Sequence, residues 1–326
     1  MRIDRQRVLI SNFTIRNCYI GIFAQPTSPW GALWFGRLVG AQYAAITRNK
    51  IINNYYGVKV ECFEPSLEAE GYISIVGNEI ANNSFGLWLE RSSSNRIYDN
   101  NFRGNTYQVL SYKSVNVWDN SYPHGGNYWS DYGGIDVKNG AGQDLPGSDG
   151  IGDTPYAIDT DNLDKYPLVG SINIFDASTW NEVTYSVHVA SNSTISSFYF
   201  NPEEGAFLRF NVTGDDGTTG FCRVAIPKSL LWVEDGWAIT VDDQPITDYV
   251  KLEDENFTYL YFTYSHSTQT VTIQGTNVIP EYTPISLPIL LLLVTTLATI
   301  INKKQRKPKT SHYPESKILN FSVSVS

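Results

Sequence analysis

Two glutamates at matching places in a repeated pattern are the residues of this chain best placed for acid–base chemistry. The segments GVKVE and GLWLE end in Glu61 and Glu90, each four residues after a glycine. If the two segments are neighbouring parallel strands, the carboxylates lie about one strand spacing, ~4.8 Å, apart. A retaining glycosidase holds its two carboxyl groups about 5–5.5 Å apart. A polysaccharide hydrolase or lyase is therefore one hypothesis for this chain.

The same two segments also offer a chemistry without catalysis. Lys59 and Trp88 alternate with apolar residues, so both side chains should point outward on the face that carries the glutamates. An indole ring can stack on a sugar, and polar groups beside it can bond to the sugar hydroxyls. Because carboxylates are common on surfaces and nothing nearby obviously buries either glutamate, we expect binding and no enzymatic activity.

An aspartate-rich segment suggests calcium. Residues 131–164 contain eight aspartates and no glutamate. Aspartate with glycine at short spacing suits Ca²⁺, which takes six to eight oxygen ligands from flexible loops. In the segment DGIGD, the expected ligands are Asp149 and Asp153, although the spacing does not match an EF-hand. The alternative is an acidic loop whose aspartates cap turns without a metal.

No copper site is expected from the sequence. The histidines, His124, His188, His266 and His312, are isolated from one another along the chain, and there is one methionine. Copper favours clusters of histidine, cysteine or methionine. The three cysteines are far apart as well, so they fit small buried side chains better than a disulfide framework or a CxxC site.

Repeated segments must position the two glutamates. The segments NKIINN (49–54), NEIANN (78–83), NRIYDN (95–100) and VNVWDN (115–120) align, with closing asparagines 29, 17 and 20 residues apart. Repeats of this size indicate stacked coils, because a single unit cannot bury its own apolar face. Alternating apolar and β-branched residues indicate that the coils are built from strands.

One residue of each repeat is expected to stack inside the coils and another at a corner. The predicted inner ladder contains Ile51, Ile80, Ile97 and Val117, and the predicted corner ladder contains Asn54, Asn83, Asn100 and Asn120. Asparagine tolerates left-handed backbone, and its amide can bond from one coil to the next. These asparagines are therefore expected to hold turns and to do no chemistry.

The stretch GNYWSDYGG (126–134) follows the last repeat, where strand edges and the apolar core would otherwise be open. We expect Tyr128, Trp129 and Tyr132 to cover this end, as terminal units of repeat proteins do. A platform on which sugars stack is the alternative. Beyond it, about seven short strands over roughly a hundred residues suggest an Ig-like β-sandwich that serves as a spacer or adhesion module.

The C-terminal segment predicts a membrane anchor. Residues 285–301 carry no charge, and NKKQRKPK follows at once. This apolar run is at the short end for a spanning helix, and its basic flank places the tail in the cytoplasm. The bulk of the chain is then extracellular, which makes five N-x-S/T sequons accessible to glycosylation. They are Asn12, Asn82, Asn192, Asn211 and Asn256.

Two further observations bound the function. The net charge of −9 makes a nucleic-acid partner unexpected. The first residues, MRIDRQRVLISNFT, lack the apolar core of a signal peptide. Since the expected topology requires export, we expect that the chain begins inside a larger protein or that its start is misplaced.

The N-x-I-x-(N/D)-N…G repeats resemble those of the NosD-like family of right-handed parallel β-helices, in the carbohydrate-binding and sugar-hydrolase group. The run NVWDNSYPHGGNYWSDYGG, then DGIGDTPYAID and NLDKYPL, is similar to the end of archaeal NosD-type surface proteins. One departure is the segment KNGAGQDLPGS (138–148), where a shorter loop is expected. The resemblance implies a membrane-anchored archaeal surface protein that has a structural role or binds glycans or surface-layer proteins. The family name implies copper maturation as a less favoured alternative.

The expected fold is thus all-β, with one C-terminal transmembrane helix. Its parts are a right-handed parallel β-helix (1–122), an aromatic and Asp-rich cap (123–170), an Ig-like β-sandwich (171–279), a membrane anchor (280–302) and a basic cytoplasmic tail (303–326).

Overall fold

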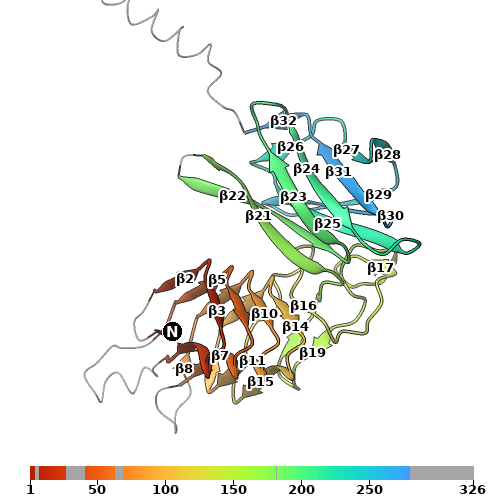
Figure 1. The fold of residues 1–326 in the computed structure, drawn as a ribbon. Coiled ribbons are helices and arrows are strands. Elements are labelled where there is room, and N and C mark those ends of the chain that lie inside the picture. The colour runs from red at the N-terminus through yellow and green to blue at the C-terminus, as the bar shows by residue number, and fades with distance from the viewer. Residues whose placement is uncertain (4–6, 27–40, 63–68, 181, 280–326) are drawn as a thin grey trace, which may run out of the picture. The chain divides into compact units, whose positions relative to one another are not determined.

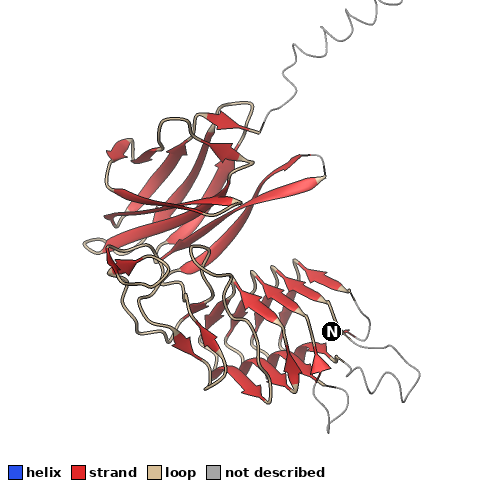
Figure 2. Cartoon of the chain, turned by 180° about the vertical axis from the view of Figure 1, so that it is seen from behind, coloured by secondary structure: helices blue, strands red, loops and turns tan. Residues whose placement is uncertain are grey.

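Strands are the only regular secondary structure in the part of the chain that the structure, a computed structural model, describes (Figures 1 and 2). The described residues are 1–3, 7–26, 41–62, 69–180 and 182–279. Within these ranges no helix occurs, and hence none that is long and apolar enough to cross a membrane. The predicted anchor (280–302) and tail (303–326) lie outside the described residues.

The first half of the chain is a parallel β-helix, whose coils run from red to yellow in Figure 1. Sheet 1 contains β1 (Arg2–Ile3), β4 (Ile20–Ala24), β7 (Tyr56–Glu61), β11 (Phe85–Glu90) and β15 (Tyr107–Tyr112). Sheet 2 contains β2 (Leu9–Ser11), β5 (Ala45–Thr47), β9 (Ser74–Val76) and β13 (Arg96–Tyr98). Sheet 3 contains β3 (Thr14–Arg16), β6 (Lys50–Ile52), β10 (Glu79–Ala81), β14 (Asn101–Arg103) and β16 (Tyr128–Trp129). A short parallel pair, β8 (Ala69–Glu70) and β12 (Ser92–Ser93), lies beside them.

The inner ladders have a different register from the predicted one. Ile51 and Ile80 do stack in sheet 3, but the next positions are Phe102 and Trp129. Ile97 belongs instead to sheet 2, and Val117 is 49% exposed. The prediction was wrong for these two residues because the N-x-I pattern enters sheet 3 at Asn49 and Asn78 but enters sheet 2 at Asn95. The repeat at 95–100 is therefore displaced by one sheet from those at 49–54 and 78–83.

The asparagines form three ladders between coils, linked through side-chain amides except at Asn116, whose backbone N–H donates to Asn162. The ladders are Asn49–Asn78–Asn100–Asn127, Asn54–Asn83–Asn105 and Asn95–Asn116–Asn162. The predicted contact of Asn54 with Asn83 is confirmed, at 3.0 Å. The predicted places of Asn100 and Asn120 in that ladder are wrong, since Asn100 stacks on Asn78 and Asn120 accepts a bond from Arg96. The coils are 29, 22 and 27 residues long along the first ladder.

Left-handed backbone occurs one residue before the stacked asparagines. Asn53, Asn82 and Asp99 have φ values of 57°, 55° and 57°. Each precedes a buried ladder asparagine, whose own amide is committed to the next coil. Each of these corners of the β-helix thus uses two residues: the first has the left-handed backbone of the turn, and the second is the asparagine of the ladder.

Aromatic rings close the end of the β-helix. Trp129 is buried and stacks on Phe102 with centroids 4.4 Å apart, and Tyr156 stacks on its other face at 4.2 Å. Tyr132 packs edge-on against Tyr156. Trp129 therefore ends the apolar core, which is the place expected for a cap residue. Two short hairpins extend the cap: β17 (Lys138–Asn139) with β18 (Leu145–Pro146), and β19 (Tyr156–Ala157) with β20 (Leu163–Asp164).

Two five-stranded antiparallel sheets follow, and they share one apolar core. The first runs in the order β21 (Ser171–Trp180), β22 (Val183–Ser191), β25 (Thr219–Pro227), β30 (Phe257–Ser265) and β29 (Tyr249–Glu253). The second runs in the order β23 (Thr194–Phe200), β24 (Phe207–Thr213), β31 (Thr268–Gln274), β27 (Ala238–Val241) and β28 (Gln244–Ile246). A further short pair joins β26 (Leu231–Trp232) to β32 (Asn277–Val278).

This part of the chain is a β-sandwich, but its strand order is not that of an Ig domain. An Ig domain places its first, second, fifth and fourth strands in one sheet. Here the fourth strand, β24, lies in the second sheet beside β23. The β-helix, cap and sandwich belong to one compact unit, Met1–Ile279. Within it, the side-chain amide of Asn101 in β14 bonds to both the N–H and the C=O of Ile172 in β21, each at 2.8 Å.

Candidate functional site

The outer face of sheet 1 brings together the four residues that the sequence singled out. In the parallel pair β7–β11, Glu61 is directly opposite Glu90, and Lys59 is directly opposite Trp88. All four side chains are half-buried. The predicted adjacency of the two carboxylates, one strand apart, is therefore confirmed.

Each carboxylate on this face has its own cation. Lys59 Nζ lies 2.7 Å from Glu61, and Arg91 lies 2.7 Å from Glu90. The indole N–H of Trp88 also donates to Glu90, at 3.3 Å. In a glycosidase, one carboxyl group of the pair must carry a proton and give it to the leaving oxygen. Glu61 and Glu90 are each paired with their own cation, and this pairing does not favour a proton on either carboxyl group.

The ammonium of Lys59 also lies among aromatic rings. Its Nζ is 5.5 Å from the ring centroid of Tyr56, 5.8 Å from that of Trp88 and 5.9 Å from that of Phe23. The cation is attracted to these ring faces. Lys59 thus lies over the Trp88 ring that was expected to stack on a sugar.

A stack of rings runs along the same face. Tyr56, Phe85 and Tyr107 occupy matching positions of β7, β11 and β15, with successive centroids 5.2 and 5.0 Å apart. Stacked rings cover one another's faces, so a free face remains only at an end of the stack. Tyr107, 56% exposed on the last strand, is at that end, and Tyr112 on the same strand is 49% exposed. Sequence reasoning missed these two tyrosines, because Tyr107 is followed by Gln108 where Tyr56 and Phe85 are followed by the repeated glycine.

The aspartates of the cap bind backbone N–H groups. Asp149 is buried and accepts from the N–H of Ile151, while Asp153 accepts from the N–H groups of Val137 and Lys138. Burial raises the pKa of Asp149, against the opposing charge of Arg223. These contacts are those of turn-capping side chains. In the described part of the chain, neither aspartate belongs to a cluster of three acidic, histidine or cysteine side chains compact enough for a metal, and calcium remains a prediction.

The predicted glycosylation sites differ in their surroundings. At three of these sites the asparagine is exposed and belongs to none of the asparagine ladders: Asn12, Asn82 and Asn256. Asn192 is exposed too, but its amide bonds to the backbone C=O of Thr219 and the N–H of Phe221. Asn211 is half-buried and accepts a bond from Thr270. A sugar on Nδ2 would compete with the hydrogen bond that Asn192 donates to Thr219, whereas the contact of Asn211 uses the amide oxygen.

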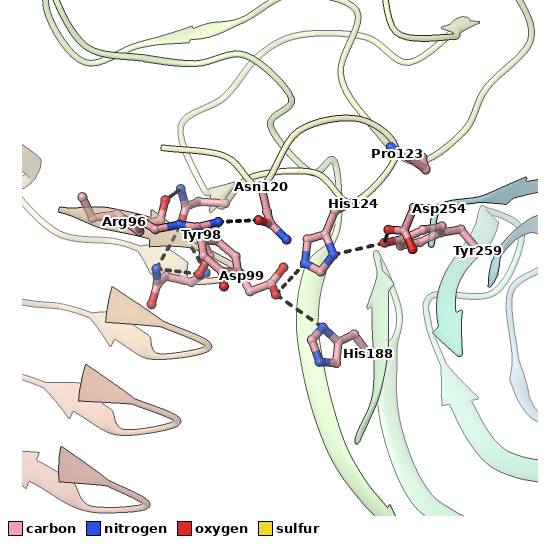
Figure 3. Close-up of polar contacts among 12 residues, drawn as sticks. Arg96, Tyr98, Asp99, Asn120, Pro123, His124, His188, Asp254 and Tyr259 are labelled. Carbon is pink, nitrogen blue, oxygen red and sulfur yellow. Dashed lines mark hydrogen bonds and ion pairs between the residues drawn. The ribbon is translucent and has the colours of Figure 1, made fainter. Parts of the chain in front are cut away.

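A second site joins histidines that are far apart in the sequence. Asp99 lies between β13 and β14, His124 lies in the cap, and His188 lies on β22. Figure 3 shows the Asp99 carboxylate between the two imidazoles. Its Oδ2 atom is 2.9 Å from His124 Nε2 and 3.4 Å from His188 Nδ1. Isolation along the sequence did not mean isolation in space, because the fold brings these separate segments together.

The other ring nitrogen of His124 leads to a second carboxylate. His124 Nδ1 lies 3.1 Å from the hydroxyl of Tyr259, which donates to Asp254 at 2.6 Å (Figure 3). Burial by itself would raise the pKa of Asp99. The charges and hydrogen bonds of His124 and His188 outweigh it, so that the pKa lies well below its usual range. Asp99 is therefore a buried, ionised group.

The space beside these residues is small. Asp99, His124, His188, Arg223 and Tyr259 line a cavity of about 10 Å³. The Arg223 guanidinium lies 4.5 Å from the centroid of the Tyr259 ring and donates to the backbone carbonyls of Asp149 and Pro123. A space of this size holds one water or one ion at most. It can bind a proton or a metal ion but not an organic substrate.

Comparison with known proteins gives one match. Residues 37–134 match the family model NosD, described as "Periplasmic copper-binding protein (NosD)". The matched range includes Asp99 and His124 but not His188. Searches among curated proteins and among solved structures found no match. Together with the parallel sheets, the match supports a NosD-like parallel β-helix.

Proposed function

We propose that this protein binds cell-surface glycans through the outer face of sheet 1, while residues 280–302 hold it in the membrane. The match to a family described as periplasmic supports a location of this protein outside the cytoplasm. The observation that carries the proposal is the free ring of Tyr107 at the end of an aromatic stack, beside the charged groups of the same face. Glycans borne by surface-layer proteins are included among these ligands.

The chemistry of this face suits a sugar. An aromatic ring stacks on the apolar face of a sugar ring, and side chains at its edge bond to the hydroxyls. Tyr107 is held rigidly, since Phe85 stacks behind it. Tyr112 and Glu90 are directly opposite each other in the pair β11–β15, which places a ring and a carboxylate side by side. A preorganised platform loses little side-chain entropy on binding.

A hydrolase or lyase that uses Glu61 and Glu90 is the second candidate. Their in-register pairing, about 4.8 Å apart by strand spacing, is the observation that favours it. The separate ion pairs with Lys59 and Arg91 weigh against a proton-donating role for either glutamate. We therefore propose binding without cleavage.

A glycan array probed with the full chain tests the proposal. We expect weak binding to a subset of glycans, which Tyr107→Ala and Tyr112→Ala each reduce at least about tenfold, in keeping with a lost stacking contact. Tyr72→Ala is the matched control, because Tyr72 is also exposed and stacked, on Tyr43, but lies outside sheet 1. Binding that survives both sheet 1 substitutions, or that Tyr72→Ala reduces equally, overturns the assignment of this face.

The same glycans test for catalysis. We expect no release of reducing ends, and no change with Glu61→Gln or Glu90→Gln. Turnover that both substitutions abolish would make the hydrolase the better description.

A further inference from the structure

We propose that Asp99, His124 and His188 form a binding site for one divalent transition-metal ion, Cu²⁺ or Zn²⁺. The site is independent of the proposed glycan face, because it shares no residue with sheet 1. It is assembled from a turn of the β-helix, the cap and a strand of the sandwich. A bound ion would therefore hold these three parts of the chain to one another.

The distances suit a metal. One potential ligand atom from each residue lies within 4.8 Å of the other two, and two of the three separations are 2.9 and 3.4 Å. Metal–ligand bonds of about 2.0–2.2 Å in a tetrahedral site put the ligand atoms roughly 3.3–3.6 Å apart. The two carboxylate–imidazole separations are close to that range, and the two imidazole nitrogens lie within 4.8 Å of each other. Asp99 and His124 are buried and His188 is half-buried, so the ligands are already ordered by packing.

The surroundings of His124 strengthen the case. A histidine that binds a metal through one nitrogen usually gives the N–H of the other to a hydrogen-bonded acceptor. Here His124 Nδ1 faces the hydroxyl of Tyr259, whose proton goes to Asp254. This chain orients the ring so that Nε2 faces Asp99. It is the arrangement that a ligating imidazole requires.

The type of ligand decides which metal fits. Two imidazole nitrogens and one carboxylate suit Cu²⁺ and Zn²⁺, whereas Cu⁺ prefers thiolate or thioether and Ca²⁺ prefers oxygen alone. No cysteine belongs to the cluster. For a given set of such ligands Cu²⁺ binds more tightly than Zn²⁺. The matched family is described as copper-binding, but His188 lies outside the matched range, so the family model does not contain this site as a whole.

The competing occupant of the cluster is a proton. If the Tyr259 proton goes to Asp254, His124 must donate from Nδ1 to Tyr259 and from Nε2 to Asp99, and is then an imidazolium. A metal takes the place of the Nε2 proton, which leaves to solvent. The buried guanidinium of Arg223 lines the same cavity and opposes a second positive charge. The carboxylate of Asp99 is therefore essential to binding.

The test uses the full chain without a histidine tag, stripped with a chelator and dialysed against CuSO₄ or ZnSO₄. We expect about one ion of either metal retained per chain, and nitrogen hyperfine splitting from two imidazoles in the Cu²⁺ paramagnetic resonance spectrum. Asp99→Asn and His188→Asn should each lower the affinity at least tenfold. His266→Asn is the control, since His266 is also buried and hydrogen-bonded, to Ser193, but lies outside the cluster.

Two outcomes overturn the inference. One is retention of no ion by the unsubstituted chain, which would leave the cluster as a structural proton network. The other is retention that the Asp99 and His188 substitutions do not lower, or a spectrum without imidazole nitrogens. The Cu²⁺ paramagnetic resonance spectrum is measured on the unsubstituted chain, so it tests for histidine ligands even if a variant fails to fold. A negative glycan array has no bearing on this result.

Discussion

The indole N–H of Trp129 donates to Oδ2 of Asp164 at 2.9 Å, inside the cap and out of contact with solvent. The same oxygen accepts from the backbone N–H of Asn127, the last asparagine of its ladder. One carboxylate thus ends the asparagine ladder and also holds the tryptophan of the cap. Burial raises the pKa of Asp164 to about 7, although the hydrogen bonds from Asn127 and Trp129 pull it down.

This carboxyl group predicts a pH dependence of stability. Its pKa in the folded chain lies above the value near 4 of an unfolded chain, so the folded chain binds a proton more tightly. The resulting stabilisation is complete below about pH 4 and is lost as the pH rises through about 7. Between pH 5 and 8 we expect the melting temperature to fall as the pH rises.

Asp164→Asn isolates this contribution, because the amide keeps an oxygen acceptor but does not titrate. We expect the variant to lose a large part of the slope between pH 5 and 8, measured by thermal unfolding of the full chain. Asp136, whose pKa burial also raises to about 7, accounts for a remaining slope of the same sign. An unchanged slope in the variant would show that Asp164 does not carry the effect.

The asparagine ladder predicts an unequal cost of two similar substitutions. Asn78 is buried, accepts from both the N–H and the amide of Asn49, and donates to Asn100. Asn78→Ala leaves these buried groups without partners and should cost about 2–4 kcal/mol of unfolding free energy. Asn120→Ala should cost less than about 1 kcal/mol, because this residue is half-buried and accepts an exposed bond from Arg96. Urea unfolding measures both, and equal costs would contradict the observed ladder register.

Calcium should have little effect on stability. The side chains of Asp149 and Asp153 are already engaged by backbone N–H groups. We expect the same melting temperature in excess Ca²⁺ and in chelator, since a ligand that binds only the folded chain must raise it. A rise of several degrees in Ca²⁺ that Asp153→Asn removes would instead establish the calcium site.

The predicted anchor gives a test of topology on intact cells. With the tail after Asn302 in the cytoplasm, external protease should digest the sandwich and leave an epitope on the tail intact. Permeabilised cells serve as the control, in which both should be digested. Loss of the tail epitope from intact cells would reverse the orientation.

Local periodicity in the sequence was enough to predict the coils and one of their faces. The alternation in GVKVE and GLWLE, each begun by the same glycine, placed Glu61 opposite Glu90 and Lys59 opposite Trp88, as the strand pairing has them. This worked because side chains alternate strictly along a strand, and because repeats of equal pattern stack in register. The change of pattern after residue 170 likewise predicted two-layered β structure there, although not its strand order.

Only the tertiary structure decided which distant segments meet. The N-x-I pattern precedes sheet 3 in two coils and sheet 2 in another, so the sequence did not distinguish the two sheets, and Ile97 and Asn100 were misplaced. The sandwich order, too, depends on pairing between strands far apart in the chain. The contact of Asp99 with His124 and His188 has no periodic signal at all. It exists because burial of the core packs a turn, a loop and a strand together, and packing depends on the whole chain and not on local spacing.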